Sequence, residues 1–403
     1  KELLIRWFCA ESGLPEDRAE TEFARSCFQF TFYAEAVETG YALEIKLDSG
    51  DPDRKPNPKP ALTKLNIPVG PVVVFGASNF PFAYSTLGGD VASALAAGCS
   101  VIVKAHAMHP HTSSISAQLI LEVAKEHDMP DGILCHLLAE DFTVGQQLVQ
   151  DPRVKAVGFT GSIGGGMALQ KLINERKEPI SLYAEMGSSN PIAVTKAALE
   201  NRATEIAKQI SASVLLNAGQ FCTSPGLLFI EETANFNSFK EELIRAFSDS
   251  ELQCMLHPGI SKRYFERVEE HSKLVTILYK GKADGNFIQP TLAEATAAQF
   301  IANPEIQEEI FGSYLTIVKC ASVSEMDECL KLLQGQLTTS IYAETEEEAA
   351  RFLPVLTAKS GRIIFNGVPT GVEVSFAQQH GGHGGKGVRG MRWRCSTARA
   401  WRA

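Results

Sequence analysis

The chain has 403 residues, of which 44% are hydrophobic and 21% charged, and its net charge is −9. This is ordinary composition for a soluble protein, and the length exceeds one hydrophobic core, so two domains are predicted. The acidic balance argues against nucleic acid as the main partner. No run approaches the length of an apolar membrane span, and the first ten residues lack a signal-peptide pattern, which predicts a cytoplasmic protein without membrane contact.

The nine cysteines are scattered and odd in number. They contain no CxxC pair and have no histidine nearby at metal-ligand spacing, which argues against zinc and predicts that no metal is bound. Reduced thiols are the expected state.

In chain order, the first predicted element is a helix over residues 15–40. Its apolar positions recur at intervals of three and four residues, and Gly40 is a stop signal. The predicted buried face contains Phe23, Cys27, Phe30, Ala34 and Val37. Four prolines between Asp48 and Asn66 then predict an extended connector with no regular element.

Short apolar strands alternate with helices over the next stretch of the chain, which is the pattern of a parallel doubly wound α/β sheet. Such sheets bind ligands at the carboxyl ends of their strands. Strands are expected at 72–75, 101–103, 133–138 and 154–159, and helices at 88–98 and 112–127. After Pro191 a second α/β unit is predicted, with strands at 226–231, 314–319, 340–343 and 362–365.

The expected domains are a cofactor-binding domain over residues 1–188, a catalytic domain over 189–372 and a C-terminal segment over 373–403. From about residue 383 the segment is Gly-rich and then Arg-rich, with no apolar period. It is interpreted as a disordered or non-native basic tail, and the alternative is a basic arm that binds a partner.

One cysteine, Cys222, stands in a polar loop that is bracketed by Gly219 and Gly226 and is followed by an apolar strand. A thiolate is a strong nucleophile, and small neighbours allow it to approach a carbonyl group, although a buried inert cysteine is the commoner case. Upstream, Glu185 lies in the segment Tyr183-Ala184-Glu185-Met186-Gly187. Together these residues suggest a nucleophile and a general base, whereas alone Glu185 is a surface or capping residue.

Residues Phe159 to Gly166 form a glycine-rich turn between a strand and a helix. Backbone N–H groups at such a turn favour a phosphate, with Gly161 and Ser162 as the contacts. The same pattern also serves close packing in many α/β proteins, so both interpretations stay open.

Taken together and in order, six short motifs resemble those of the aldehyde dehydrogenase superfamily. Within it, the likeness is greatest to the 2,5-dioxovalerate (α-ketoglutaric semialdehyde) dehydrogenases and related NADP-linked fatty aldehyde dehydrogenases. The motifs are Phe75 to Pro81, Val101 to His106, Phe159 to Ser162, Glu185 to Pro191, Gly219 to Thr223 and Glu308 to Gly312. The resemblance implies a Rossmann-like cofactor domain joined to an α/β catalytic domain, here truncated at both ends.

The resemblance also implies three catalytic roles. Cys222 attacks the aldehyde carbon, Glu185 activates the water that hydrolyses the resulting thioester, and the Asn79 amide with the Cys222 N–H stabilises the oxyanion. A preorganised donor of this kind is worth about 3 kcal/mol in the transition state. Taken alone, Asn79 is equally a turn residue.

For the cofactor, the resemblance places Lys104 at the adenosine ribose, with His106 as a helper, Glu309 at the nicotinamide ribose and Phe311 against the nicotinamide. In place of the acid that NAD-preferring members use to hold the ribose hydroxyls, this chain has Ala107. A 2′-phosphate is therefore not repelled, and NADP is predicted, with NAD as the alternative.

The expected reaction is the oxidation of a small-molecule aldehyde, 2,5-dioxopentanoate, to 2-oxoglutarate. Members of the family form homo-oligomers. The alternatives are a fatty or aromatic aldehyde dehydrogenase, or a truncated relative that lacks activity. The chain departs from the family pattern at Ser313 and Ser224 and at both ends, which leaves oligomer assembly an open question.

Overall fold

The computed structural model describes residues 1–378, 380 and 381, so the predicted basic tail lies outside the described residues. The chain forms two compact units. The first contains Lys1–Glu11 and Pro15–Ala184, and the second begins with Ser12–Leu14 and continues from Glu185. Among the described residues, no helix is both long and apolar enough to cross a bilayer.

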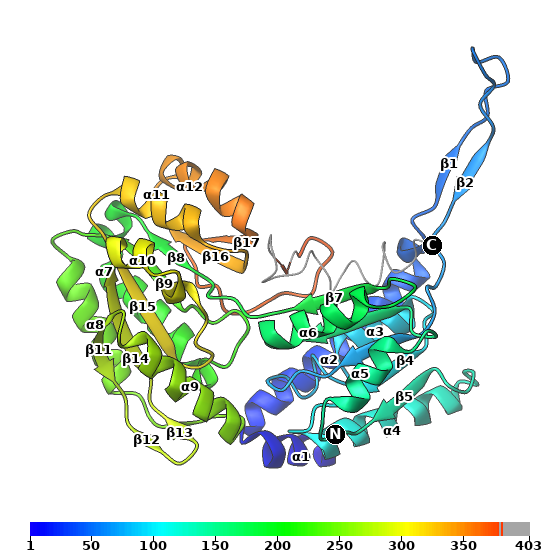
Figure 1. Cartoon of the computed structure of the whole chain (residues 1–403), viewed down its shortest axis with the longest axis horizontal. Coiled ribbons are helices and arrows are strands. Elements are labelled where there is room, and N and C mark those ends of the chain that lie inside the picture. Colours follow the sequence, from blue (N-terminus) through cyan, green and yellow to red (C-terminus); the bar gives the residue numbers. More distant parts are fainter. Residues whose placement is uncertain (379, 382–403) are drawn as a thin grey trace. The chain divides into compact units, whose positions relative to one another are not determined.

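The first unit is built on a five-stranded sheet with the order β5-β4-β3-β6-β7 (Figure 1). The pairs β5–β4, β4–β3 and β3–β6 are parallel, as predicted for a doubly wound sheet. The strands are β3 (Val72–Phe75), β4 (Val101–Lys104), β5 (Leu134–Leu137), β6 (Ala156–Thr160) and β7 (Ser181–Glu185). The helices between them are α3 (Gly89–Ala96), α4 (Pro110–Glu126), α5 (Thr143–Gln150) and α6 (Ile163–Asn174). Val72 to Val74 are buried on both faces because helices cover both sides of a parallel sheet.

Two helices, α1 (Glu2–Ser12) and α2 (Glu16–Glu38), precede this sheet. The predicted helix is confirmed, and Gly40 follows its end in the left-handed conformation. Its predicted buried face is wrong by one residue. The buried face consists of Ala19, Glu22, Ser26, Gln29, Tyr33 and Ala36. A polar face is buried there because Glu22 forms hydrogen bonds to backbone inside the unit, which hydrophobic periodicity does not reveal.

The proline-rich connector is a second correction, because part of it is a regular hairpin. Strand β1 (Lys46–Asp48) pairs antiparallel with β2 (Leu62–Lys64), and an isolated bridge joins Asp51 to Lys59. Pro52, Pro56 and Pro58 fall in the loop between Asp51 and Lys59, and Pro60 lies between that bridge and β2, so none of them occupies a paired position. The 3-10 turn η1 (Tyr41–Leu43) precedes the hairpin.

The second unit is built on a seven-stranded sheet with the order β11-β14-β15-β9-β8-β16-β17. Only the edge strand β11 is antiparallel to its neighbour. The strands are β8 (Ile192–Val194), β9 (Leu227–Glu231), β11 (Thr276–Lys280), β14 (Thr291–Thr296), β15 (Tyr314–Cys320), β16 (Gln336–Tyr342) and β17 (Ser360–Phe365). The predicted strands are present, whereas β8, β11 and β14 were not predicted. Strand β8 is short, and β14 is rich in Ala and Thr.

Helices pack on this sheet and bury two large apolar clusters, one of them containing Phe229 and Phe300 and the other Phe239 and Tyr342. The helices are α7 (Lys196–Leu215), α8 (Phe236–Ser248), α9 (Pro258–His271), α10 (Ala297–Ala302), α11 (Val323–Leu332) and α12 (Glu346–Lys359), with the 3-10 turns η2 (Leu216–Gly219) and η3 (Pro304–Gln307). The short strands β10 (Gln253–Cys254), β12 (Ala283–Asp284) and β13 (Phe287–Ile288) form a separate small sheet.

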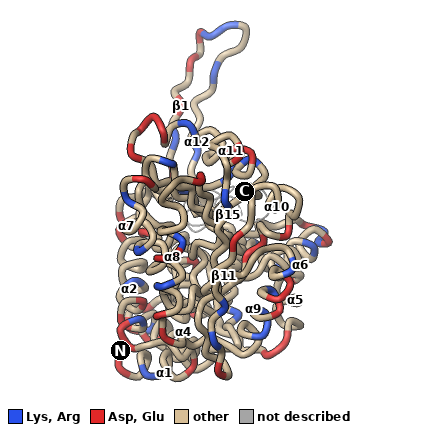
Figure 2. Tube along the Cα trace, turned by 90° about the vertical axis from the view of Figure 1, so that its left-hand side faces the viewer, with Lys and Arg blue, Asp and Glu red and all other residues tan. Residues whose placement is uncertain are grey.

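Figure 2 shows acidic and basic residues interleaved along the described part of the trace. In the view drawn, neither sign of charge gathers over one element.

Candidate active site

Cys222 stands in a tight loop between η2 and β9 of the second unit. The loop begins with three consecutive residues in the left-handed region, Asn217, Ala218 and Gly219, with φ of 49°, 55° and 66°. A Cβ on Gly219 would lie 2.5 Å from the Gly312 carbonyl carbon, so only glycine fits this close backbone approach. Cys222 follows this strained turn and precedes β9, and its side chain is half-buried.

Two buried amide side chains hold this loop in place. Asn190 Nδ2 donates to the carbonyl oxygens of Cys222 at 2.8 Å and Ser224 at 2.9 Å. On the other side, Gln220 donates to the Cys254 carbonyl at 3.2 Å and accepts from the Leu256 N–H at 2.9 Å. The backbone around the thiol is therefore fixed by hydrogen bonds from both flanks.

The loop that carries Asn190 is itself clamped by Gln336, the first residue of β16. Gln336 Oε1 accepts from the Ser189 and Asn190 N–H groups at 2.9 and 3.1 Å and from the Ser188 hydroxyl at 2.9 Å. Sequence reasoning missed Gln336, because nothing local connects residue 336 with residues 188–190. Only the neighbouring positions of β8 and β16 in the sheet reveal the contact.

Glu185 is the last residue of β7, at the point where the chain passes into the second unit. It is 8% exposed, so the interpretation as a surface or capping glutamate is wrong. Met186 beside it is buried as well.

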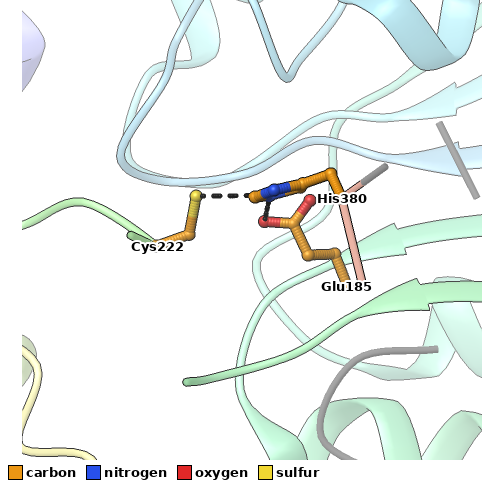
Figure 3. Close-up of side chains that lie close together, drawn as sticks. All are labelled: Glu185, Cys222 and His380. Carbon is orange, nitrogen blue, oxygen red and sulfur yellow. Dashed lines mark hydrogen bonds and ion pairs between the residues drawn. The ribbon is translucent and has the colours of Figure 1, made fainter. Parts of the chain in front are cut away.

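The Glu185 carboxylate, the Cys222 thiol and the imidazole of His380 converge, as Figure 3 shows. His380 Nε2 lies 2.9 Å from Glu185 Oε1 and 3.8 Å from Cys222 Sγ. The interacting atoms of the three residues all lie within 4.8 Å of one another. The sequence had placed Cys222 and Glu185 together by resemblance, and the structure brings them together within the second unit.

Sequence reasoning missed His380 because it stands where the chain becomes Gly-rich, at the start of the predicted tail. Its ring is nevertheless buried, with 3% of the side chain exposed. A histidine followed by Gly381 and Gly382, directly after a region of family pattern, was the available signal.

Glu309 and Phe311 lie close to the cysteine loop in the same unit. They line a pocket together with Phe221 and Ser224, the residues on either side of Cys222 and Thr223. A Cβ on Gly187 would overlap the Glu309 carboxylate, which explains the glycine two residues after Glu185. The structure therefore brings both predicted nicotinamide-side residues to the neighbourhood of the thiol.

Asn79 belongs to the first unit, so its predicted approach to Cys222 stays a prediction. Within the first unit its loop is tightly held from α2. Glu22 Oε1 accepts from the Phe82 and Ala83 N–H groups at 2.8 and 3.0 Å, and Glu22 Oε2 pairs with Arg18 at 3.1 Å. The Arg18 guanidinium also donates to the Asn79 carbonyl at 3.5 Å and lies 4.4 Å from the Phe80 ring centre.

Lys104 is the last residue of β4, and His106 follows the strand. Both lie at the same sheet edge as the Asn79 loop, because that loop follows β3, the parallel neighbour of β4. Lys104 Nζ donates to the Ala139 carbonyl at 3.2 Å. Burial lowers the pKa of Lys104, and the Asp141 carboxylate opposes that shift. His106 Nδ1 accepts from the Met108 N–H at 3.2 Å, which stabilises the turn after the strand.

Gly161 and Ser162 follow β6, which is the other parallel neighbour of β3. The Ser162 hydroxyl caps α6 by accepting from the Gly165 N–H at 3.1 Å. A Cβ on Gly161 would lie 2.7 Å from the Phe159 ring, whereas one on Gly164 would meet no atom within 4 Å. Gly161 therefore packs closely against Phe159, and the predicted phosphate contacts of Gly161 and Ser162 stay predictions.

Comparison with known proteins identifies the family of this chain. The model of the aldehyde dehydrogenase family matches residues 1–396 of the chain. The chain belongs to the aldehyde dehydrogenase family. The predicted resemblance is thereby confirmed, and this is a family of NAD(P)-dependent enzymes.

Among its relatives, this aldehyde dehydrogenase is 40% identical to α-ketoglutaric semialdehyde dehydrogenase 2 of Azospirillum brasilense over 94% of the chain and 73% of the relative. It is 39% identical to α-ketoglutaric semialdehyde dehydrogenase of Acinetobacter baylyi over 92% of the chain and 72% of the relative. Its fold is similar to that of the glyceraldehyde-3-phosphate dehydrogenase GapN of Methanocaldococcus jannaschii, crystallised with NADP. That match has a TM-score of 0.82 at 20% identity, over 97% of this chain and 82% of the other. The predicted fold class is therefore confirmed.

Proposed function

We propose that this aldehyde dehydrogenase oxidises 2,5-dioxopentanoate to 2-oxoglutarate with NADP, through a thioester on Cys222. The observation that carries the proposal is the convergence of a thiol and a buried carboxylate within 4.8 Å in one unit. Two α-ketoglutaric semialdehyde dehydrogenases at about 40% identity support the choice of substrate.

In this mechanism the Cys222 thiolate forms a C–S bond to the aldehyde carbon, and the former carbonyl oxygen becomes an oxyanion. The Asn79 amide and the Cys222 N–H are the donors proposed for that oxyanion. When bound, NADP would supply the acceptor for the hydride of this carbon. Once the hydride has left and the oxyanion has returned to a carbonyl, Cys222 carries a thioester.

Hydrolysis of the thioester is assigned to Glu185. The carboxylate takes a proton from a water molecule, the water oxygen bonds to the acyl carbon, and the C–S bond breaks to return the thiolate. A buried carboxylate suits this step because its basicity is raised when few waters solvate its charge. The carboxylic acid product then leaves.

The residues of the first unit fit a dinucleotide by chemistry and by space. Lys104 supplies a cation near the sheet edge, and the open turn at Gly164 can take a phosphate at the amino end of α6. Ala107 is exposed and uncharged. The choice of NADP rests on Ala107, because an acid there would repel the 2′-phosphate.

The substrate is tested by comparing turnover of 2,5-dioxopentanoate, decanal and benzaldehyde, followed by the absorbance of the reduced nicotinamide. The dioxo acid should give the highest kcat/KM, and Cys222→Ala should abolish turnover of all three. Faster oxidation of decanal or benzaldehyde would contradict the proposed substrate but would be consistent with the proposed mechanism. Full activity of Cys222→Ala would overturn the mechanism. No turnover in the unmodified chain, with Cys222 still reactive toward iodoacetamide, would indicate the inactive relative.

The cofactor is tested separately with Ala107→Glu. The new acid should lower kcat/KM for NADP by about tenfold or more while leaving that for NAD nearly unchanged. Asp141→Asn is the matched control, because it removes an existing carboxylate that acts on Lys104 and should raise the preference for NADP. Equal use of both cofactors by all three proteins would contradict the proposed role of Ala107.

A further inference from the structure

His380 is the one member of the converging cluster without a role in the mechanism above. Its Nε2 faces two groups at once, Glu185 Oε1 at 2.9 Å and Cys222 Sγ at 3.8 Å (Figure 3). Within the part of the chain that the structure describes, its Nδ1 has no hydrogen-bond partner. Packing alone does not require a buried imidazole to face both a thiol and a carboxylate through one nitrogen.

We propose that His380 is a third catalytic residue, which as an imidazolium cation stabilises the Cys222 thiolate and is held in place by Glu185. This proposal rests on the proposed function, because it assumes that Cys222 is the nucleophile. It adds a means of ionising that nucleophile before the aldehyde arrives.

His380 Nε2 lies at hydrogen-bond distance from Cys222 Sγ, at the outer limit for a bond to sulfur, and the same nitrogen forms the 2.9 Å ion-pair contact with Glu185 Oε1. The nitrogen that faces the thiol can therefore take its proton, and the cation formed in this way lies beside the carboxylate.

The proton balance of the step is simple. The Cys222 S–H bond breaks and leaves its electron pair on sulfur, and the proton adds to Nε2 of the His380 ring, the nitrogen that faces the sulfur. The product is a cation between two anions, the thiolate and the Glu185 carboxylate. A cation beside the sulfur favours the thiolate form.

The other titratable group close to this cluster is Glu309, whose carboxylate lies against Gly187. It comes from the segment before β15, whereas Glu185 ends β7 and Cys222 precedes β9. A second acid near the cluster is electrostatically compatible with a cation at His380.

After the thioester forms, the sulfur no longer carries a charge. The ring then has one anionic neighbour instead of two, so its cationic form is less favoured and it releases a proton to solvent. Glu185 regains basicity at the moment when it must accept a proton from water. The same contact thus assists the two halves of the reaction in turn.

The test is the pH dependence of Cys222 alkylation by iodoacetamide, measured without cofactor or substrate and in the presence of a chelator. Mass spectrometry of the Cys222 peptide gives the rate, and the exposed Cys135 in the same protein is the reference thiol. We expect the midpoint for Cys222 to lie about 2 units below that of Cys135. A midpoint equal to that of Cys135 overturns the proposal without any variant.

His380→Gln retains a side chain of similar size and one N–H donor but cannot carry a charge. It should raise the Cys222 midpoint by about 2 units and leave that of Cys135 unchanged. Its kcat/KM should fall about tenfold to a hundredfold near neutral pH and recover at alkaline pH, where the thiol ionises unaided. A purely structural role would lower activity at every pH and leave the alkylation midpoint in place, which would overturn the proposal.

Failure of this inference can be separated from failure of the proposed function. Turnover that survives in Cys222→Ala removes both. An inactive Cys222→Ala together with an unshifted midpoint in His380→Gln removes only the role of His380. If His380→Gln does not fold, the comparison of Cys222 with Cys135 in the unmodified chain still decides the question.

Discussion

Two glutamates are buried among the residues that the structure describes, and they are buried in different ways. Glu22, on α2 of the first unit, is 2% exposed and receives two backbone N–H groups and the Arg18 guanidinium. Glu185, at the start of the second unit, is 8% exposed and faces His380 and Cys222. One carboxylate is surrounded by backbone N–H groups and a guanidinium, and the other faces an imidazole and a thiol.

The comparison shows that burial alone does not identify a catalytic acid or base. Burial raises the pKa of Glu22, while Arg18 and the backbone donors of Phe82 and Ala83 oppose that shift. Those fixed donors hold the Asn79 loop together but have no proton to exchange. Glu185 lies beside an imidazole and a thiol, which can exchange protons with it, so it is the one suited to chemistry.

The largest effect is expected from Glu185→Gln. It should lower kcat by a factor of about 10² to 10⁴, because the general base for thioester hydrolysis is lost. The first turnover should still release one equivalent of reduced cofactor per site, since hydride transfer precedes hydrolysis. Stopped-flow absorbance measures this burst, and its absence would show that Glu185 acts earlier than proposed.

Glu22→Ala should instead destabilise the fold by about 3 to 5 kcal/mol, because it leaves Arg18 and two backbone N–H groups without their acceptor. The midpoint of urea unfolding measures the change. Glu22→Gln is the matched control: it keeps the size and one acceptor oxygen, so its loss should be smaller. If Glu22→Gln lost turnover without losing stability, the contrast between the two glutamates would fail.

A smaller effect is expected from Asn190→Ala, which removes the donors to the Cys222 and Ser224 carbonyls. The loss should be about 2 kcal/mol, together with slower alkylation of Cys222 as its loop loosens. Asn190 has φ of 42°, which strains alanine. Asn190→Gly separates the loss of the hydrogen-bond donors from the backbone strain, because glycine lacks the amide but adopts a positive φ without strain. Unchanged alkylation in both variants would show that the loop is held by other contacts.

The smallest effect is expected from Glu11→Gln, at a carboxylate that caps α4. Glu11 accepts from the His111 N–H and from the Thr112 N–H and hydroxyl. Burial would raise its pKa, but these hydrogen bonds outweigh burial and lower it. Loss of a cap of this kind costs about 1 kcal/mol at neutral pH.

The pH dependence of that loss follows from the lowered pKa. The contribution of Glu11 is present above its unfolded pKa of about 4.3 and is lost as the pH falls through its folded pKa. The difference in unfolding free energy between Glu11→Gln and the parent chain should therefore shrink on acidification. A difference that grows at low pH would contradict the assignment of the sign.

Local sequence determined much of this protein. Apolar runs such as Val72 to Val74 specify buried parallel strands, and small residues such as Gly187 and Gly219 are fixed by the atoms that would overlap a Cβ. Ordered motifs around Glu185 and Cys222 predicted the family, because nucleophile and base each lie in a short, recognisable segment. These features depend on near neighbours in the chain, so periodicity and motif carry them.

The tertiary structure decided the rest. It buries the polar face of α2 rather than the apolar face one residue away, because Glu22 has backbone partners sixty residues further along the chain. It joins Gln336 to the loop before β8, and His380 to Glu185 and Cys222. Each of these contacts links polar atoms that are distant in sequence, and a hydrogen bond between such atoms leaves no periodic trace that residues alone would reveal.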